Sequence, residues 1–123
     1  MIWKFTGDRP VYQQIMEQIQ AAILTGELPV GNRIPSVRDL ATMARVNPNT
    51  MQHALQALEA KKLLITDSTN GRFVTSDPAI LNAIRDERIN ALVNECISRF
   101  SAYGISPTMA AELLAKSEER NDT

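Results

Sequence analysis

With 123 residues, 44% of them hydrophobic and 22% charged, the chain has the size of one small domain plus an appendage and the composition of a globular protein. It contains no apolar run near the ~18 residues of a membrane span, no signal-peptide pattern and only one cysteine, Cys96, so we expect a cytoplasmic protein with no membrane association and no internal disulfide. The formal net charge is −1, but residues 33–72 carry six basic against three acidic side chains and residues 78–123 carry five against seven, which indicates different roles for the two parts.

The first predicted helix starts at Pro10, because the missing N–H of proline is not needed in the first turn of a helix. Ile15, Ile19 and Ile23 recur at intervals of four residues and form one apolar stripe. Gly26 ends this helix, and a connection rich in glycine and proline follows.

Two short helices come next, over residues 36–44 and 48–61. Ser36 and Asn47 are good N-caps, and Pro48 suits the first helical position. A short helix pair with such a tight connection is typical of the helix-turn-helix, in which the second helix lies in the major groove of DNA. Such pairs also occur in all-helical cores that bind no DNA, so the spacing alone leaves both interpretations open.

The second of these helices carries four polar residues that lie largely off its apolar stripe, Asn49, Gln52, His53 and Gln56. Asn and Gln can pair in bidentate fashion with adenine, whereas a merely solvated face usually carries Glu and Lys. The helix has no acid before Glu59, and its N-terminus suits a phosphate. His53 is the only histidine, so we expect it to face a groove or solvent and expect no His-based metal site within one chain.

The pattern then changes to a period of two over residues 63–66 and 72–75, which predicts two strands, and Asn70-Gly71 is a strong turn signal between them. A hairpin directly after a helix-turn-helix makes the winged variant of that fold. We expect Gly71 to take a positive φ and to let the backbone approach a narrow groove, with Arg72 beside it. The hairpin can also be an edge element that completes the domain, and both roles can hold together.

A last section opens at Asp77-Pro78 with a long helix that Gly104 ends, and Ser106-Pro107 starts a short helix. The long helix has two adjoining apolar rows, although a helix packed on one side needs only one stripe about 100° wide. The rows comprise Ile89, Val93 and Ile97, and Leu92, Cys96, Phe100 and Tyr103. One row can pack within the chain, so we expect the other to form a homodimer interface. We expect the polar residues 116–123 to fray.

The predicted fold is therefore mainly α with a small β-hairpin. A winged helix-turn-helix DNA-binding domain occupies residues 1–77, and a short two-helix dimerisation segment with a polar C-terminal tail occupies residues 78–123.

Several stretches between residues 10 and 74 keep the order and spacing of one known pattern. They are Pro10–Ile15, Gly26–Leu28, Gly31, Ile34–Ala41, Val46–Thr50, Ala54-Leu55, Leu58-Glu59 and Gly71–Val74. Through them the chain resembles the GntR family of bacterial transcription regulators. Because only residues 78–123 remain for a second part, the chain is similar to the small YtrA-like subfamily. That resemblance implies that the helical tail is linked to dimerisation.

The resemblance also implies particular DNA contacts. It places Arg38 of the second helix, Asn49 and Thr50 of the recognition turn, and Gly71 of the wing tip on DNA. Pro48 replaces an arginine used by many members, Lys62 replaces a glycine, and Thr69 and Arg72 replace a glycine and a threonine of the usual wing. Arg72 can supply a compensating charge. The complete set of predicted DNA-binding residues is Arg33, Ser36, Arg38, Asn47, Asn49, Thr50, Gln52, His53, Gly71 and Arg72.

We therefore expect a sequence-specific transcription regulator, a repressor that binds a palindromic operator in double-stranded DNA as a homodimer. The resemblance also implies possible target genes, because members of this subfamily often control genes for ABC transporters. The alternative is a winged-helix protein–protein adaptor that binds no DNA, and Arg38 and the amide-rich face argue against it. We expect neither an enzyme nor a cofactor, because the sequence contains no nucleophile–base pair, metal cluster or cofactor loop. The sequence does not identify a small-molecule effector. The two C-terminal helices leave little room for a pocket, so both the presence and the absence of an effector stay open.

Overall fold

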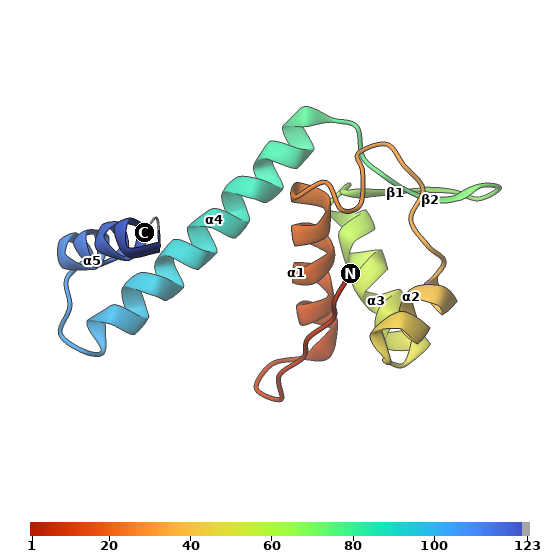
Figure 1. Cartoon of the computed structure of the whole chain (residues 1–123). Helices are drawn as coiled ribbons and strands as arrows, with labels where there is room; N and C mark the ends of the chain where they lie inside the picture. The colour runs from red at the N-terminus through yellow and green to blue at the C-terminus, as the bar shows by residue number, and fades with distance from the viewer. Residues whose placement is uncertain (122–123) are drawn as a thin grey trace. The chain divides into compact units, whose positions relative to one another are not determined.

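The computed structural model describes residues 1–121, which form five α-helices and one antiparallel hairpin (Figure 1). In chain order the elements are α1 (Val11–Leu24), α2 (Val37–Ala44), α3 (Pro48–Ala60), β1 (Leu64–Asp67), β2 (Gly71–Val74), α4 (Pro78–Ser101) and α5 (Pro107–Asn121). This order confirms the predicted fold class. No helix within these residues combines the length and the apolar character needed to cross a membrane.

The two short helices begin where the sequence predicted, and the side chains named as caps form the capping hydrogen bonds. The Oγ of Ser36 accepts from the backbone N–H of Asp39 at 3.1 Å. The Oδ1 of Asn47 accepts from the backbone N–H of Asn49 at 2.7 Å, and Pro48 is the first residue of α3. Each cap is worth about 1 kcal/mol, because it satisfies a donor that the helix itself leaves without a partner.

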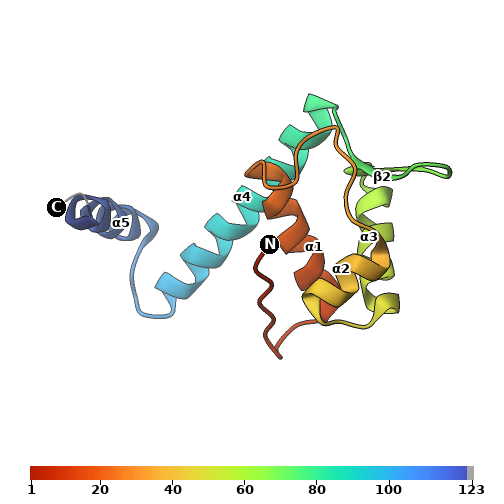
Figure 2. The same cartoon turned by 45° about the vertical axis from the view of Figure 1, so that its right-hand side comes forward.

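The core of the N-terminal part is aliphatic and lies where α1 and α2 pack against α3 (Figures 1 and 2). Ile15 and Ile19 of α1, Leu40 of α2, and Leu55 and Leu58 of α3 are all fully buried. Burial of each such side chain stabilises the fold by about 1.5–3 kcal/mol. The three helices are thereby held as one support for the hairpin, which extends away from them in both views.

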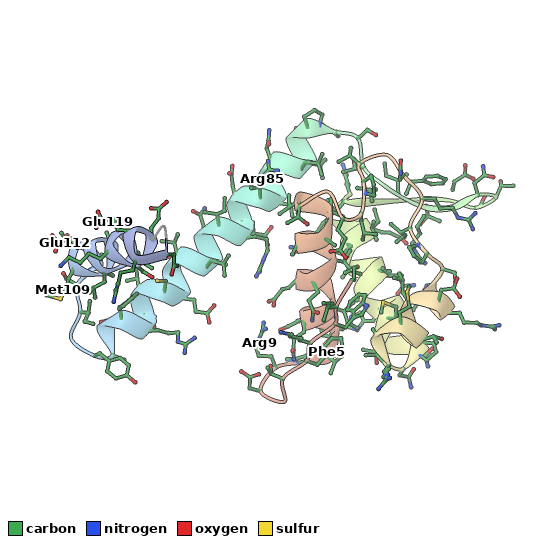
Figure 3. The ribbon with its side chains drawn as sticks, viewed as in Figure 1. Phe5, Arg9, Arg85, Met109, Glu112 and Glu119 are labelled. Atoms are coloured by element: carbon green, nitrogen blue, oxygen red, sulfur yellow. The ribbon has the colours of Figure 1, made fainter. Side chains whose placement is uncertain are left out.

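The segment before α1 runs alongside that helix. The backbone N–H of Lys4 donates to the side-chain oxygen of Gln18 at 3.0 Å, and the Gln18 amide donates back to the Lys4 carbonyl at 2.7 Å. In the loop that follows, Arg9, which Figure 3 labels, lies just before α1. It donates two hydrogen bonds to the Glu17 carboxylate, at 2.7 and 3.0 Å. Phe5, also labelled in Figure 3, is partly buried against the core. These contacts fix the start of α1.

The hairpin, which we call the wing, has a three-residue loop, Ser68–Asn70. Leu64 lies opposite Val74 and Asp67 lies opposite Gly71, so each strand is shifted by one residue toward the turn from its predicted position. Gly71 has a φ of 100°, which confirms the expected positive value. The loop itself is closed by the Asp67 side chain, which accepts hydrogen bonds from within the turn.

Residues 31–34 pair with β2, although the sequence pattern predicted only a glycine- and proline-rich connection there. The N–H of Gly31 donates to the carbonyl of Val74 at 3.0 Å, and the N–H of Val74 donates to the carbonyl of Asn32 at 2.9 Å. The N–H of Ile34 donates to the carbonyl of Arg72 at 2.9 Å. The chain that leads into α2 is thus joined to the wing by three backbone hydrogen bonds.

The chain divides into two compact units, Met1–Arg85 and a second unit that begins at Asp86. Helix α4 runs through the division, and its residues Ile80, Leu81 and Ile84 belong to the core of the first unit. The second unit contains the rest of α4 and the whole of α5.

The expectation that residues 116–123 fray is wrong for the described part, because α5 continues to Asn121. Lys, Glu and Arg are good helix formers even without burial, and Glu112 stands four residues before Lys116, a spacing that stabilises a helix through opposite charges. Residues 122 and 123 of the predicted tail lie outside the described residues.

Candidate nucleic-acid interface

A groove of about 420 Å³ lies between the start of α2 and the wing. Five of the ten predicted DNA-binding residues line it together, namely Arg33, Ser36, Arg38, Gly71 and Arg72. The other residues along the groove are Ile34, Pro35, Val37, Thr66, Asp67 and Ser68. The fold therefore brings residues from two distant stretches of the sequence into one concave, arginine-rich surface, as an anion-binding site requires.

Arg33 lies directly over the backbone of the wing. A Cβ added at Gly71 would stand 3.0 Å from the Arg33 Nε and 3.4 Å from its Cζ. Two features therefore call for glycine at this position, the positive φ and the close approach of a guanidinium group. The predicted role of Gly71 accounted for the first feature only.

Arg38 and Ser36 mark the beginning of α2, on the opposite wall of this groove. Both side chains are exposed, and neither belongs to the buried core. Because the N-terminus of α2 carries a partial positive charge, Arg38 and the helix end act in the same direction on an anion.

The start of α3 presents the second group of predicted residues. Asn47 and Asn49 are exposed and Thr50 is half-buried. The Oδ1 of Asn47 already accepts the capping hydrogen bond, so its side-chain N–H₂ group is the part left to donate to a ligand. The first turn of α3 therefore offers hydrogen-bond donors and a helix N-terminus to one partner.

His53 is exposed on α3 and stacks on a residue that the sequence analysis did not single out. Its ring lies 4.1 Å from the ring of Tyr12, centroid to centroid, with an angle of 19° between the planes. Tyr12 belongs to α1, so this contact joins α1 to the polar face of α3. A separation of 41 residues hides such a pair from any local pattern.

Arg72 also has partners within the chain. Its Nε donates to the Glu59 carboxylate, with which it forms an ion pair, and its Nη2 donates to the Oε1 of Gln52 at 3.4 Å. Burial raises the pKa of Glu59, but hydrogen bonds from Arg72 and Thr66 and the charge of Arg72 outweigh burial and leave that pKa below its usual range. Glu59 thus remains ionised and holds the wing arginine against α3. Sequence reasoning missed this role of Glu59.

Asp67 gives the wing tip one negative charge. Its carboxylate accepts from the backbone N–H of Thr69 at 2.9 Å and from the side-chain amide of Asn70 at 3.1 Å. The hydrogen bond from the Thr69 backbone, with that from Asn70, lowers the pKa of Asp67 below its usual range. Asp67 also belongs to the groove lining, which it shares with Arg33, Arg38 and Arg72.

The second unit exposes the apolar rows predicted to form a dimer interface. Leu92 is 57% exposed, Val93 49% and Tyr103 87%. Ile89 and Ile97 are also exposed, whereas Cys96 and Phe100 are half-buried. On α5, which Figure 3 marks with Met109, Glu112 and Glu119, the large exposed apolar residues are Met109, Leu113 and Leu114.

Helix α5 covers these rows only in part. A groove of about 330 Å³ separates the two helices, and α4 lines it with Leu92, Val93, Cys96 and Ile97 while α5 lines it with Pro107, Ala110, Ala111 and Leu114. A second hollow of about 520 Å³ lies along the C-terminal half of α4 and the turn that follows it, and it is lined by Leu92, Glu95, Cys96, Arg99, Phe100 and Tyr103. Both rows therefore retain open apolar surface within this unit.

Known proteins share both the sequence pattern and the fold. Residues 11–74 match the pattern of the bacterial regulatory proteins of the gntR family. The chain is 35% identical over 68 residues to the HTH-type transcriptional repressor YtrA of Bacillus subtilis (strain 168), which covers 55% of this chain and 52% of that protein.

Two solved structures extend the comparison. A GntR family transcriptional regulator from Listeria monocytogenes matches with a TM-score of 0.83 and 31% identity over 91% of this chain and 98% of its own. The AraR DNA-binding domain, in complex with operator ORX1, matches with a TM-score of 0.56 and 26% identity over 61% of this chain and 96% of its own.

Proposed function

This chain belongs to the GntR family of bacterial regulatory proteins and is a DNA-binding transcription regulator, and we propose that it is a repressor that binds a palindromic operator as a homodimer. The observation that carries the proposal is the convergence of Arg33, Ser36 and Arg38 with the wing in one groove.

The groove and the start of α3 take different parts in the proposed complex. Arg33, Ser36 and Arg38, with the N-terminus of α2, bind backbone phosphates and fix the register of the protein on DNA. Asn49 and Thr50, in the first turn of α3, reach base edges in the major groove. Further contacts come from Asn47, Gln52 and His53 along the same helix and from the wing at Gly71.

We propose that the second unit supplies the dimer interface. The apolar rows of α4 keep open surface around Leu92 and Val93, and exposed apolar patches of this kind mark association surfaces. A twofold pair places two α3 helices on one DNA molecule, which implies a palindromic operator.

The repressor assignment rests on the similarity to the YtrA repressor, and control of transporter genes rests on the family resemblance alone. A protein–protein adaptor with the same fold is the competing function. An adaptor of this kind does not require arginines on both walls of a groove. A DNA-binding measurement distinguishes the two functions, because the adaptor would not bind DNA.

The first test is selection of genomic fragments by the purified chain, followed by affinity measurements on the selected operator. Arg38→Ala should weaken binding by about 1–3 kcal/mol, the scale of one good base or charge-assisted contact. Its thermal unfolding should not change, because Arg38 is exposed. Arg85→Ala, an exposed arginine on α4, is the matched control and should bind normally. Equal affinity of the Arg38→Ala and parent proteins at matched salt would remove Arg38 from the interface.

The second test addresses the dimer. Sedimentation of the full chain at micromolar concentration should show a dimer, and Leu92→Glu should shift it toward monomer, because a charge would be buried in an apolar interface. Monomer formation should weaken operator binding and lower its dependence on salt, since one protomer neutralises only half as many phosphates as two. A parent chain that sediments as a monomer would contradict the proposed interface.

A further inference from the structure

Arg72 stands in the wing, but its guanidinium group is directed at α3. The Nε donates to Glu59 and the Nη2 donates to Gln52, so two different nitrogens of the planar group are engaged at once. The Arg72 side chain is 17% exposed and that of Glu59 is 27% exposed, so the ion pair is largely shielded from solvent. Such an arrangement suits a positioning residue better than a free cation that awaits a phosphate.

The contact with Arg72 also decides how the Gln52 amide is turned. An arginine side chain has five N–H donors and no acceptor, so only the oxygen of a glutamine amide can face it. The Oε1 of Gln52 must therefore lie toward the wing, and the N–H₂ group lies on the other side. The chemistry of Arg72 fixes this orientation regardless of how the two amide atoms are assigned.

This orientation changes what Gln52 can recognise. Bidentate pairing with adenine requires the oxygen and the nitrogen of the amide to face the same base edge, to accept from N6 and donate to N7. With its oxygen turned toward Arg72, the part of Gln52 left to face a base edge is the N–H₂ group, which presents donors alone. Guanine presents two acceptors in the major groove, N7 and O6, and is the base that such a donor group fits.

We propose that Arg72, anchored by Glu59, orients Gln52 so that this residue selects guanine over adenine at the base pair it reads. The inference rests on the proposed function, because it requires α3 to lie in the major groove. It assigns Arg72 an effect on specificity through another side chain, in place of the direct wing contact that the sequence predicted.

The test compares base preferences on a library in which each operator position is varied in turn. Gln52→Ala identifies the position that Gln52 reads, where the parent protein should favour guanine over adenine by about tenfold. Arg72→Lys keeps the charge and can keep the ion pair, but one Nζ cannot replace both the Nε and the Nη2 of arginine. Arg72→Lys should therefore abolish or reverse the guanine preference at that position and leave the salt dependence unchanged.

Glu59→Gln serves as a second variant that releases the guanidinium without altering Arg72, and it should relax the same preference. Thermal unfolding of each protein shows whether the fold is intact. Retention of the guanine preference in both variants would overturn the inference, as would a Gln52→Ala protein with unchanged preference at every position. A uniform loss of affinity with a reduced salt dependence in an Arg72→Ala protein, which removes the charge, would show a phosphate contact and would also overturn the inference. Those outcomes leave operator binding intact, whereas a parent protein that selects no DNA would defeat the proposed function itself.

Discussion

Substitution of Gly71 by alanine should damage the protein in two separable ways. The residue has a φ of 100°, a conformation that costs a residue with a β-carbon about 1–2 kcal/mol. The new Cβ would also stand 3.0 Å from the Arg33 Nε, which is closer than ordinary van der Waals contact, so the Arg33 side chain must shift by a few tenths of an ångström. The first effect lowers the free energy of unfolding, and we expect the second to draw the Arg33 guanidinium out of its position in the groove.

The two effects are measured by different assays. Urea unfolding should show a decrease of about 1–2 kcal/mol in the free energy of unfolding. Fluorescence anisotropy of a labelled operator across a salt series gives the slope of log affinity against log salt concentration. The magnitude of this slope should decrease by about 0.9 for each phosphate that Arg33 no longer neutralises, or by about twice that for a dimer. Gly26→Ala is the matched control, because Gly26 has a φ of 84° but no atom within 4 Å of an added Cβ. It should lose stability without any change in the salt slope.

A double-mutant cycle tests whether Arg33 links the wing to DNA. In an Arg33→Ala protein, Gly71→Ala should reduce DNA affinity no further, because the side chain that it displaces is already absent. A full additional decrease in affinity in that background would refute the reasoning, since Gly71 would then act through its own approach to DNA. An unchanged salt slope in the single Gly71→Ala protein would refute it as well.

Two further predictions concern carboxylates near the groove. Asp67→Asn should strengthen DNA binding severalfold at low salt and less at high salt, because it removes a negative charge beside the arginines. The Asn side-chain oxygen can still accept the hydrogen bond from Thr69. Fluorescence anisotropy measures the affinity, and weaker binding would show that the carboxylate itself is needed. Because the pKa of Glu59 is lowered in the folded protein, its contribution to stability is present above its unfolded pKa and is lost as the pH falls below about 4.5. Urea unfolding from pH 7 to pH 3 should therefore show a steeper decrease in the free energy of unfolding for the parent than for Glu59→Gln. Parallel decreases in the two proteins would contradict this prediction.

The elements that follow local chemistry could be predicted from the sequence. Ser36, Asn47 and Pro48 start their helices because caps and first-turn prolines depend on residues within one turn. The wing was placed to within one residue by its alternating pattern and by the Asn70-Gly71 turn signal. The end of α5 was not predicted, because a polar sequence of good helix formers has no apolar stripe that marks how far the helix extends.

The interactions that organise the candidate site were not predictable in the same way. Arg72 meets Glu59 across 13 positions of the sequence, and Arg33 meets Gly71 across 38. The first pair depends on how the wing packs on α3, and the second depends on how residues 31–34 lie on β2. Both are tertiary arrangements with no local signature. Sequence reasoning therefore identified most of the polar residues in the groove but not which of them hold one another in place.

The pairing of residues 31–34 with β2 also bears on how such regulators can be re-engineered. A wing whose backbone paired only within its own two strands could be exchanged between relatives as a separate module. Here Ile34 and Arg72 share a backbone hydrogen bond, and two residues later the chain enters α2 at Ser36. A transplanted wing would carry its own register into that pairing and shift the helix that bears Arg38. The transferable module is the wing together with residues 31–38, two segments that are far apart in the gene and must be altered together.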